Sequence, residues 1–485
     1  MKKTRRIFEI NFVGALLLAT FIISCTSNVE VLQITTSPTD SWQLVENSHV
    51  SPQQSDTVLN FDIDTKQTCQ EIDGFGACFN ELGWTSLNLL SENDRNEILN
   101  ELFTIGKGAN FNICRMPVAA NDFSRDWYSY NEVEGDFAME NFSIENDKET
   151  LIPFIHAALS CNSDLKIWAS PWCPPTWMKY NKHYASSYNG DRPEKAYRNG
   201  LRKDQQGYEG TDMFIQEPRY MEAYANYFSK FVSAYKSEGI NIFAVMPQNE
   251  FNSAQVFPSC CWKSSSLATF VGEYLGPKMH EKGVEVFFGT MERANAAMID
   301  TVLTHEKAKE FVSAVGFQWA GKGAVGAVHE KYPDMKLYQT EQECGNGRND
   351  WAGATHSWNL LKHYFDNGVS AYMYWNISLL EGGISRWGWA QNSLVVVDPQ
   401  SKTYKFTPEY YLMKHISRFV KPGAHYVSVS DEFGGLVFRN PDNSLVVLYM
   451  EKQGANTTLS LAIDGEKSID LHMTANTINT FVIKP

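Results

Sequence analysis

The sequence predicts an α/β protein built from a (β/α)8 TIM barrel and an antiparallel β-sandwich side domain. First, eight apolar runs alternate with longer stretches in which apolar residues recur at helical spacing. Second, the last part of the chain consists of short alternating segments separated by turns such as Asn-Pro-Asp-Asn and Asp-Gly. Third, a length of 485 residues accommodates one barrel of roughly 250 to 400 residues and a smaller domain.

The barrel is predicted over residues 71–420. Its strand candidates are residues 71–79, 111–117, 165–172, 242–250, 284–290, 314–320, 336–341 and 369–376. Helical patterns lie between most of these runs, over residues 150–160, 219–238, 265–282 and 354–367. A last helix is expected over residues 407–419, because Lys421-Pro422-Gly423 follows as a stop signal. Near-continuous apolar runs are typical of parallel strands that are buried on both faces.

The side domain is predicted over residues 421–485, with strands at 426–430, 435–439, 444–450, 457–462 and 480–483. Residues 58–70 begin with an alternating pattern and are expected to contribute one or more strands to this domain. Residues 26–57 are rich in Ser, Thr, Gln, Asn and Pro, which predicts a flexible tether.

Residues 1–25 have the pattern of an export signal. A basic start precedes an apolar segment over residues 12–23, which is shorter than the ~20 residues of a transmembrane helix. Ile22-Ile23-Ser24-Cys25 resembles a bacterial lipoprotein cleavage box, with Cys25 as the lipidated residue. We therefore expect an exported protein, lipid-anchored in a bacterial membrane and facing the periplasm or the cell surface. An ordinary secretory signal with an incidental cysteine is the alternative.

Charge and composition exclude several classes of partner. The formal net charge of −14 argues against nucleic acid and against anionic membrane surfaces, so contact with a membrane is expected only through the lipid anchor. The eight cysteines other than Cys25 are scattered, which predicts buried free thiols and no disulfide framework. Because no Cys or His arrangement has metal-site spacing, we expect neither a metal nor another cofactor.

Two apolar runs end in a carboxylate. The run 336–341 ends at Glu341, and the run 242–250 ends at Glu250. A charged residue at the carboxyl end of a buried barrel strand lies at the mouth of the barrel, where active sites form. Two carboxyl groups that face one another there can act as general acid/base and nucleophile on a glycosidic bond. Glu343, two residues beyond Glu341, is an alternative nucleophile.

Other strand ends also carry polar or aromatic side chains. Aromatic faces stack on sugar rings, and amides and guanidinium groups bind hydroxyls and carboxylates. We therefore expect a substrate-binding set of Arg115, Asp122, Trp172, Asn249, Trp319 and Trp375. Core packing is the alternative role for the tryptophans, and a salt bridge inside the barrel is the alternative for Arg115.

Five motifs in order resemble glycoside hydrolase family 30, which contains glucosylceramidases, β-1,6-glucanases and β-xylosidases. They are Gly74-Phe75-Gly76-Ala77, Arg115-Met116-Pro117 with Asp122-Phe123-Ser124, Ala169-Ser170-Pro171-Trp172, Gln248-Asn249-Glu250 and Thr340-Glu341. The resemblance runs from about residue 74 to residue 392. It implies a TIM barrel with a β-sandwich side domain and an O-glycosyl hydrolase activity.

The resemblance also implies residue roles. Glu250 is then the acid/base and Glu341, directly after Thr340, the nucleophile of a retaining mechanism. We expect their mutual charge and Arg115 to push the two pKa values apart, with Glu250 raised and Glu341 ionised. Asn249 is expected to donate to the sugar 2-hydroxyl. The same resemblance implies that Asp122 and Trp172 bind the outer hydroxyls of that sugar. It also implies that Trp375 forms the floor of the sugar-binding pocket.

Departures from the family pattern bear on the substrate. Where lysosomal-type glucosylceramidases carry a histidine before the sixth-strand tryptophan, this chain has Gln318, followed by Trp319 and Ala320. The leading interpretation is an exported retaining β-glycosidase acting on β-linked glucose, foremost an endo-β-1,6-glucanase. The alternatives are a glucosylceramidase-like enzyme, an exo-acting β-glucosidase or β-xylosidase, and a non-catalytic glycan-binding lipoprotein. The presence of both carboxylates opposes the last of these.

Overall fold

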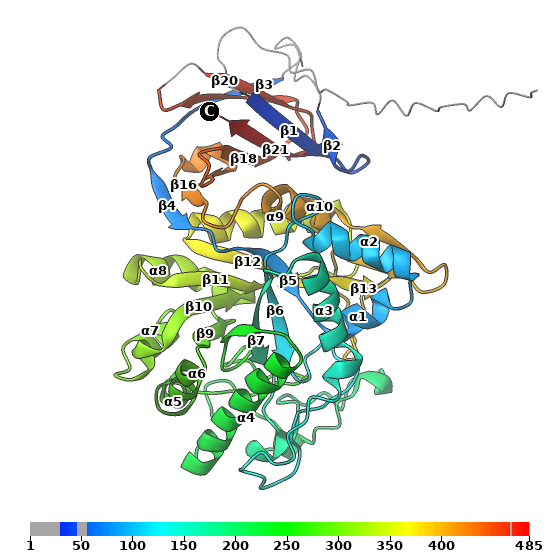
Figure 1. Cartoon of the computed structure of the whole chain (residues 1–485), viewed down its shortest axis with the longest axis vertical. Coiled ribbons are helices and arrows are strands. Elements are labelled where there is room, and N and C mark those ends of the chain that lie inside the picture. Colours follow the sequence, from blue (N-terminus) through cyan, green and yellow to red (C-terminus); the bar gives the residue numbers. More distant parts are fainter. Residues whose placement is uncertain (1–29, 46–55, 466–467, 485) are drawn as a thin grey trace, which may run out of the picture.

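The chain folds into a closed barrel of eight parallel strands with a β domain beside it (Figure 1). The computed structural model describes residues 30–45, 56–465 and 468–484. The predicted signal segment with Cys25, and part of the predicted tether, lie outside the described residues. Both elements of the predicted fold class, the (β/α)8 barrel and the side domain, are confirmed.

The barrel strands follow the predicted apolar runs in sequence order. Strand β12 pairs with β5 and so closes the ring. The eight strands are β5 (Gly74–Cys78), β6 (Ile113–Val118), β7 (Lys166–Pro171), β8 (Ile242–Val245), β9 (Glu285–Met291), β10 (Val312–Gln318), β11 (Lys336–Glu341) and β12 (Val369–Asn376). Their side chains are buried nearly throughout, which explains why the runs lack a polar alternation.

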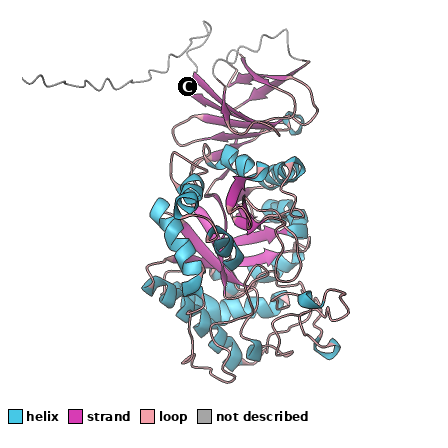
Figure 2. Cartoon of the chain, turned by 90° about the vertical axis from the view of Figure 1, so that its right-hand side faces the viewer, coloured by secondary structure: helices cyan, strands magenta, loops and turns pink. Residues whose placement is uncertain are grey.

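Helices surround the barrel strands, as Figures 1 and 2 show. They are α1 (Glu81–Leu87), α2 (Glu92–Phe103), α3 (Leu151–Cys161), α4 (Pro218–Ser237), α5 (Ser264–Phe270), α6 (Gly276–Glu281), α7 (Ala297–Leu303), α8 (Val325–Lys331), α9 (Trp351–Asp366) and α10 (Pro408–Ser417). Helix α4 shows why these segments are helical. Pro218 occupies its first turn, and Tyr224, Tyr227, Phe231 and Tyr235 recur at helical spacing and are all buried.

Strand β8 ends earlier than predicted. It stops at Val245, so Glu250 lies in the following loop and not at a strand end. Pro247 has no backbone N–H and cannot continue a regular ladder. The chain nevertheless stays beside β7, because the Met246 N–H donates to the Ala169 carbonyl and the Asn249 N–H donates to that of Pro171.

A three-stranded sheet lies between the last barrel strand and the last helix, where no strand was predicted. It consists of β13 (Ser378–Leu380), β14 (Val395–Asp398) and β15 (Thr403–Phe406). Strand β13 has only three residues, and such a short segment shows no readable period.

The side domain contains two sheets. The order in the larger is β2 (Gln43–Leu44), β1 (Glu30–Thr36), β21 (Ile478–Lys484), β18 (Leu445–Met450), β17 (Leu436–Arg439), β16 (His425–Val427) and β4 (Thr68–Glu71). The smaller sheet is β20 (Ile469–Met473), β19 (Thr457–Ile463) and β3 (Thr57–Ile63). The early strand β3 thus joins segments late in the sequence, and it pairs with β19 in parallel.

The predicted tether over residues 26–57 is wrong for part of its length. Residues Glu30–Thr36 form β1, which pairs antiparallel with β21 along its whole length. The stretch has a polar composition, yet it forms a strand in which Ile34 and Thr36 are buried on one face. Gln33 is also buried, and its side chain donates to the His472 carbonyl. A prediction from composition alone does not detect such a strand.

The side domain docks on the barrel through helix α10. His415 is fully buried and hydrogen bonds to Thr480 of β21 at 2.8 Å and to Thr36 of β1 at 2.9 Å. Burial lowers the pKa of His415 to about 3, so the imidazole is neutral and one ring nitrogen donates while the other accepts. Trp42 covers this contact, with the Lys414 ammonium 4.5 Å from its ring centre.

The described residues contain eight cysteines, and all are free thiols. Six of them are buried, Cys161 is partly buried and Cys69 is exposed. Among the described residues, no helix has the length and apolar composition needed to cross a bilayer.

Candidate active site

The two predicted carboxyl groups meet at the carboxyl-terminal mouth of the barrel. Glu341 is the last residue of β11, and Glu250 lies in the loop after β8. Their exposed fractions are only 4% and 7%. Because buried carboxyl groups need hydrogen-bond or ionic partners, the residues around them determine their orientation and their charge.

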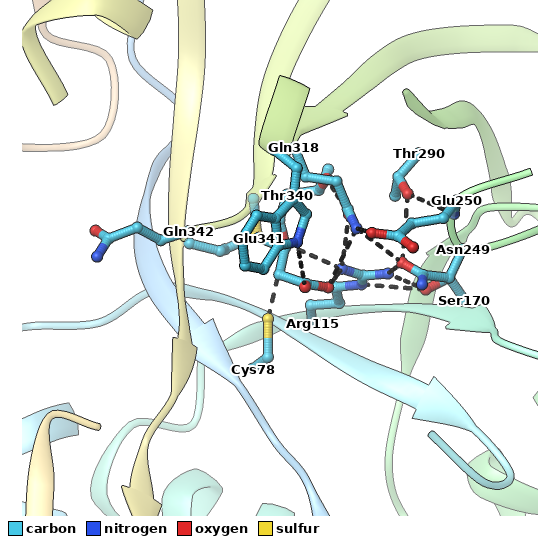
Figure 3. A network of polar contacts seen from close by, with 12 residues as sticks. Cys78, Arg115, Ser170, Asn249, Glu250, Thr290, Gln318, Thr340, Glu341 and Gln342 are labelled. Carbon is cyan, nitrogen blue, oxygen red and sulfur yellow. Dashed lines mark hydrogen bonds and ion pairs between the residues drawn. The ribbon is translucent and has the colours of Figure 1, made fainter. Parts of the chain in front are cut away.

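Arg115 of β6 occupies the centre of this cluster (Figure 3). Its Nη1 donates to Glu341 Oε2 at 2.9 Å, and its Nη2 donates to Asn249 Oδ1 at 2.7 Å and to Ser170 Oγ at 2.8 Å. The Trp172 ring lies over the guanidinium, 4.5 Å from ring centre to Cζ. The guanidinium is completely buried and always charged, so it fixes its partners in one plane.

Gln318, at the end of β10, lies between the two carboxyl groups. Its Nε2 is 3.2 Å from Glu250 Oε1 and 3.4 Å from Glu341 Oε2. Since Glu250 Oε1 and Glu341 Oε2 both accept from Gln318 Nε2, the distance between these two oxygens is smaller than the sum of the two hydrogen-bond lengths. This favours the about 5 to 5.5 Å spacing of a retaining pair over the wider spacing of an inverting pair, which must admit a water molecule.

The amide of Asn249 has a defined orientation. Its Oδ1 accepts from Arg115 at 2.7 Å, from Gln318 at 3.2 Å and from the Thr290 hydroxyl at 3.3 Å. Since three donors surround the oxygen, the NH₂ group must point away from them, where it can donate to a ligand hydroxyl. Thr290 also accepts from the Glu250 N–H at 2.8 Å.

Sequence reasoning did not select Thr290, Ser170 or Gln318 as site residues. Thr290 lies within β9, and Ser170 is a small residue inside a recognised motif. The sequence could have indicated them in one way. Ser170 and Thr290 lie on the strands next to β8, and Gln318 lies on the strand next to β11, and these two strands lead to the predicted carboxylates. Gln318 stood directly before a selected tryptophan.

Two site residues have a left-handed backbone conformation. Glu250 has φ of 46°, and so does Trp319. This region is unfavourable for residues with a side chain and is concentrated at functional sites. The conformation lets the Trp319 indole donate to Glu341 Oε1 at 3.1 Å, so Glu341 accepts from Trp319 on one oxygen and from Arg115 on the other.

Burial raises the pKa of both catalytic candidates: the rise expected for Glu250 is present, whereas the pKa of Glu341 rises as well instead of shifting in the opposite direction. The pKa of Glu341 rises to about 7 against the opposing charge of Arg115, and burial also raises the pKa of Glu250 above its usual value. Two buried carboxyl groups this close do not both ionise at low cost. Because only Glu341 contacts Arg115, the negative charge of the pair resides on Glu341 and the proton on Glu250.

Asp122, Trp172 and Trp375 lie beside the charged cluster. The two indole rings are stacked with centres 5.4 Å apart, and both are buried. Among the described residues, no group hydrogen bonds to Asp122 Oδ1 or to the Trp375 indole N–H, although both atoms are buried. Burial raises the pKa of Asp122, and the charges of Glu341 and Glu250 raise it further. These free polar atoms are suited to bind the hydroxyls of a ligand.

The structure separates Glu343, the alternative nucleophile, from the cluster. Its carboxylate pairs with Lys322 and lies 3.2 Å from His356 Nε2. Hydrogen bonds from His356 and Lys322 lower the pKa of Glu343. Glu343 is therefore engaged in a rim ion pair, and Glu341 alone of the two contacts Arg115.

The fold and this site are those of an O-glycosyl hydrolase with a (β/α)8 barrel. Residues 72–420 match the sequence family described as "Glycosyl hydrolase family 30 TIM-barrel domain". The chain belongs to glycoside hydrolase family 30. The resemblance noted from the five sequence motifs is thereby confirmed.

Individual relatives cover nearly the whole chain. "Putative glucosylceramidase 4" of Caenorhabditis elegans is 28% identical over 457 residues, covering 87% of this chain and 83% of that protein. "Endo-1,6-beta-D-glucanase BGN16.3" of Trichoderma harzianum is 25% identical over 457 residues, covering 89% and 88%. The solved structure of "The endo-beta1,6-glucanase BT3312" superposes with a TM-score of 0.76 at 21% identity, covering 93% of this chain and 99% of the other.

Glu341→Gln and Glu343→Gln form a matched pair of substitutions. We expect Glu341→Gln to lower kcat for an aryl β-glycoside by about 1,000-fold or more, because the amide is not a nucleophile. Glu343→Gln removes only a rim ion pair and should leave turnover essentially unchanged. Steady-state kinetics of both purified variants tests this, and an active Glu341→Gln enzyme would refute the role expected for Glu341.

Arg115→Gln should shift the pH profile. Without the cation, the pKa of Glu341 rises, so the carboxylate protonates at higher pH than in the wild type. We expect the acidic limb of kcat/KM to move up by about one pH unit or more. Arg125→Gln is the control, because Arg125 pairs with Glu81 and Glu149 outside the site. An acidic limb that stays in place in Arg115→Gln would contradict the assignment of charge to Glu341.

Proposed function

We propose that the protein is a retaining β-glycoside hydrolase that cleaves β-1,6-linked glucan internally. One observation supports this above all: Arg115 binds Glu341, while the Gln318 amide contacts both Glu341 and Glu250, which brings the two carboxyl groups close together. A glycan-binding protein without catalysis has no need of a second, protonated carboxyl group beside the first.

The reaction would proceed by double displacement. The Glu341 carboxylate attacks the anomeric carbon, the bond from this carbon to the leaving oxygen breaks, and the Glu250 proton passes to that oxygen. The product is a covalent glycosyl-enzyme and an alcohol. Glu250, now ionised, then takes a proton from water as the water attacks the anomeric carbon and frees Glu341. The arrangement of charge on the pair, negative on Glu341 and neutral on Glu250, is the one that starts this cycle.

The bound sugar would lie on the side of the site that is formed by residues at the carboxyl ends of β6, β7 and β12 and in the loops that follow them. The NH₂ group of Asn249 is oriented to donate to the 2-hydroxyl, a contact that strengthens in the transition state. Asp122 Oδ1 and the Trp375 indole N–H, buried and without partners among the described residues, would bind outer hydroxyls. The stacked Trp172 and Trp375 rings offer apolar surface to the sugar ring.

The choice of substrate rests on the relatives and on one residue. An endo-1,6-β-D-glucanase from Trichoderma harzianum is among the relatives, and an endo-β-1,6-glucanase shares the fold. Gln318 stands where the family pattern gives lysosomal-type glucosylceramidases a histidine. A glucosylceramidase-like activity is the second candidate, because a putative glucosylceramidase is 28% identical to the chain. The net charge of −14 speaks against nucleic acid as a partner.

Product analysis on four substrates separates these candidates. The protein is incubated with β-1,6-glucan, β-1,3-glucan, xylan and glucosylceramide, and the soluble products are resolved by chromatography. A ladder of β-1,6-linked oligosaccharides is expected. Free glucose alone would indicate an exo-acting enzyme, and release of ceramide would support the second candidate. The Glu341→Gln variant serves as the inactive control.

We also propose that the enzyme is exported and lipid-anchored through Cys25. The support is the basic and apolar start of the chain and the Ile22-Ile23-Ser24-Cys25 motif. In a bacterial host, Cys25→Ser should move the protein from the membrane fraction to the soluble fraction or leave its signal uncleaved. Cys69→Ser is the control, because Cys69 is an exposed thiol of the side-domain strand β4. An unchanged membrane association in Cys25→Ser would refute the anchor.

A further inference from the structure

Glu292 is a buried carboxyl group to which neither the family motifs nor the mechanism above assigns a role. It follows β9 directly, and only 1% of its surface is exposed. Neither of its carboxyl oxygens has a hydrogen-bond partner among the described residues. A carboxyl group buried for structural reasons normally has such partners, so two free oxygens point to a ligand that supplies them.

Its neighbours place Glu292 at the barrel mouth beside the acid/base. Thr290, two residues earlier, accepts from the Glu250 N–H at 2.8 Å, and Glu292 lies close enough to Glu250 for the two carboxyl groups to interact electrostatically. On the other side, Met291 is in register with Phe317 of β10, just before Gln318 and Trp319. Glu292 therefore lies between the loop that carries Glu250 and the turn that carries Trp319.

The nearest cation is already engaged. Arg293 pairs with Glu209, and its Nη2 also lies 3.4 Å from Ser253 Oγ. Burial raises the pKa of Glu292 to about 8, and Glu250 raises it further in the state in which Glu250 is ionised. At neutral pH, Glu292 is therefore a carboxylic acid with one donor and one free acceptor. A carboxylic acid kept neutral by its surroundings is a good hydrogen-bond donor to a substrate oxygen.

The order of the barrel strands shows which part of a substrate reaches Glu292. The residues expected to hold the sugar follow β6, β7 and β12, whereas β9 and β10 lie on the far side of β8. Glu250 stands between these two groups and gives its proton to the leaving oxygen. The leaving group therefore departs past Glu250 toward β9 and β10.

We propose that Glu292 is a leaving-group binding residue, whose carboxylic acid donates to and accepts from hydroxyl groups of the departing sugar. It then selects leaving groups that are themselves sugars over those without a hydroxyl. This inference rests on the proposed glycosidase function and adds a binding position for the second sugar of the substrate.

The test compares two substrates that differ only in the leaving group. One is a β-1,6-linked glucose disaccharide, and the other is 4-nitrophenyl β-glucoside. In Glu292→Leu, which keeps the volume but has no polar atom, kcat/KM for the disaccharide should fall about tenfold further than kcat/KM for the aryl glucoside. Glu292→Gln should restore most of this difference, because an amide also offers a donor and an acceptor.

A melting temperature separates a binding role from a structural one. Since Glu292→Leu removes two unpartnered buried oxygens, we expect its melting temperature to equal or exceed that of the wild type. Glu292→Met provides a second apolar variant if the leucine variant does not fold. Equal losses on both substrates, or no loss on the disaccharide, would overturn the proposal. If the wild type cleaves neither these two substrates nor any of the four substrates of the product analysis, the proposed glycosidase function itself fails.

Discussion

The buried guanidinium of Arg115 is the constraint on which the site depends. A permanent cation that is removed from water must have its donors satisfied and its charge balanced inside the protein. Glu341 supplies the charge, while Ser170, Asn249 and the Thr340 carbonyl accept most of the remaining hydrogen bonds. These partners come from different strands of the barrel, so one planar group sets their relative positions. Glu341 is held in place by the same contact that favours its ionised form.

The site contains strained backbone and buried polar groups without partners among the described residues. The rest of the fold must compensate for their destabilising effect on the folded state. Glu250 and Trp319 have left-handed backbones, and Asp122, Trp375 and Glu292 keep buried polar atoms without partners among the described residues. Each such feature lowers the stability of the folded state. The compensating burial lies elsewhere: in a continuous apolar core that joins the barrel to side-domain residues such as Phe438, and in the His415 contact with β1 and β21. The side domain therefore belongs to the support of the barrel.

The barrel could be predicted because parallel strands that are buried on both faces appear in the sequence as long apolar runs. Glu341 could be predicted because it is the last residue of one of these runs. Glu250 was found by its motif, although Pro247 ends the strand before it. Strand β1 was missed because its buried residues include Gln33 and Thr36, whose burial depends on partners more than 400 residues away. Thr290 and Glu292 were missed because their roles follow from strand register and from neighbours in space, which composition does not report. The pKa of Glu341 differs from the expected direction because burial acts on both carboxyl groups alike.

Residues at the barrel mouth differ in how firmly they are bound to the charged cluster. On the side of β6 and β7, Arg115, Asn249 and Trp172 are linked through the same guanidinium, so a change in one disturbs the charge on Glu341. Directly after β9, Glu292 has no such links among the described residues, and Arg293 is engaged with Glu209. By contrast, the Glu292 neighbours Thr290, Gln318 and Trp319 hydrogen bond to the cluster. Substitution of Glu292 can therefore alter the leaving group that is accepted while the ion pair of Arg115 and Glu341 stays in place. This independence of Glu292 allows one catalytic arrangement to serve different aglycones, because, within the part of the chain that the structure describes, Glu292 shares no hydrogen-bond partner with the groups that break the bond.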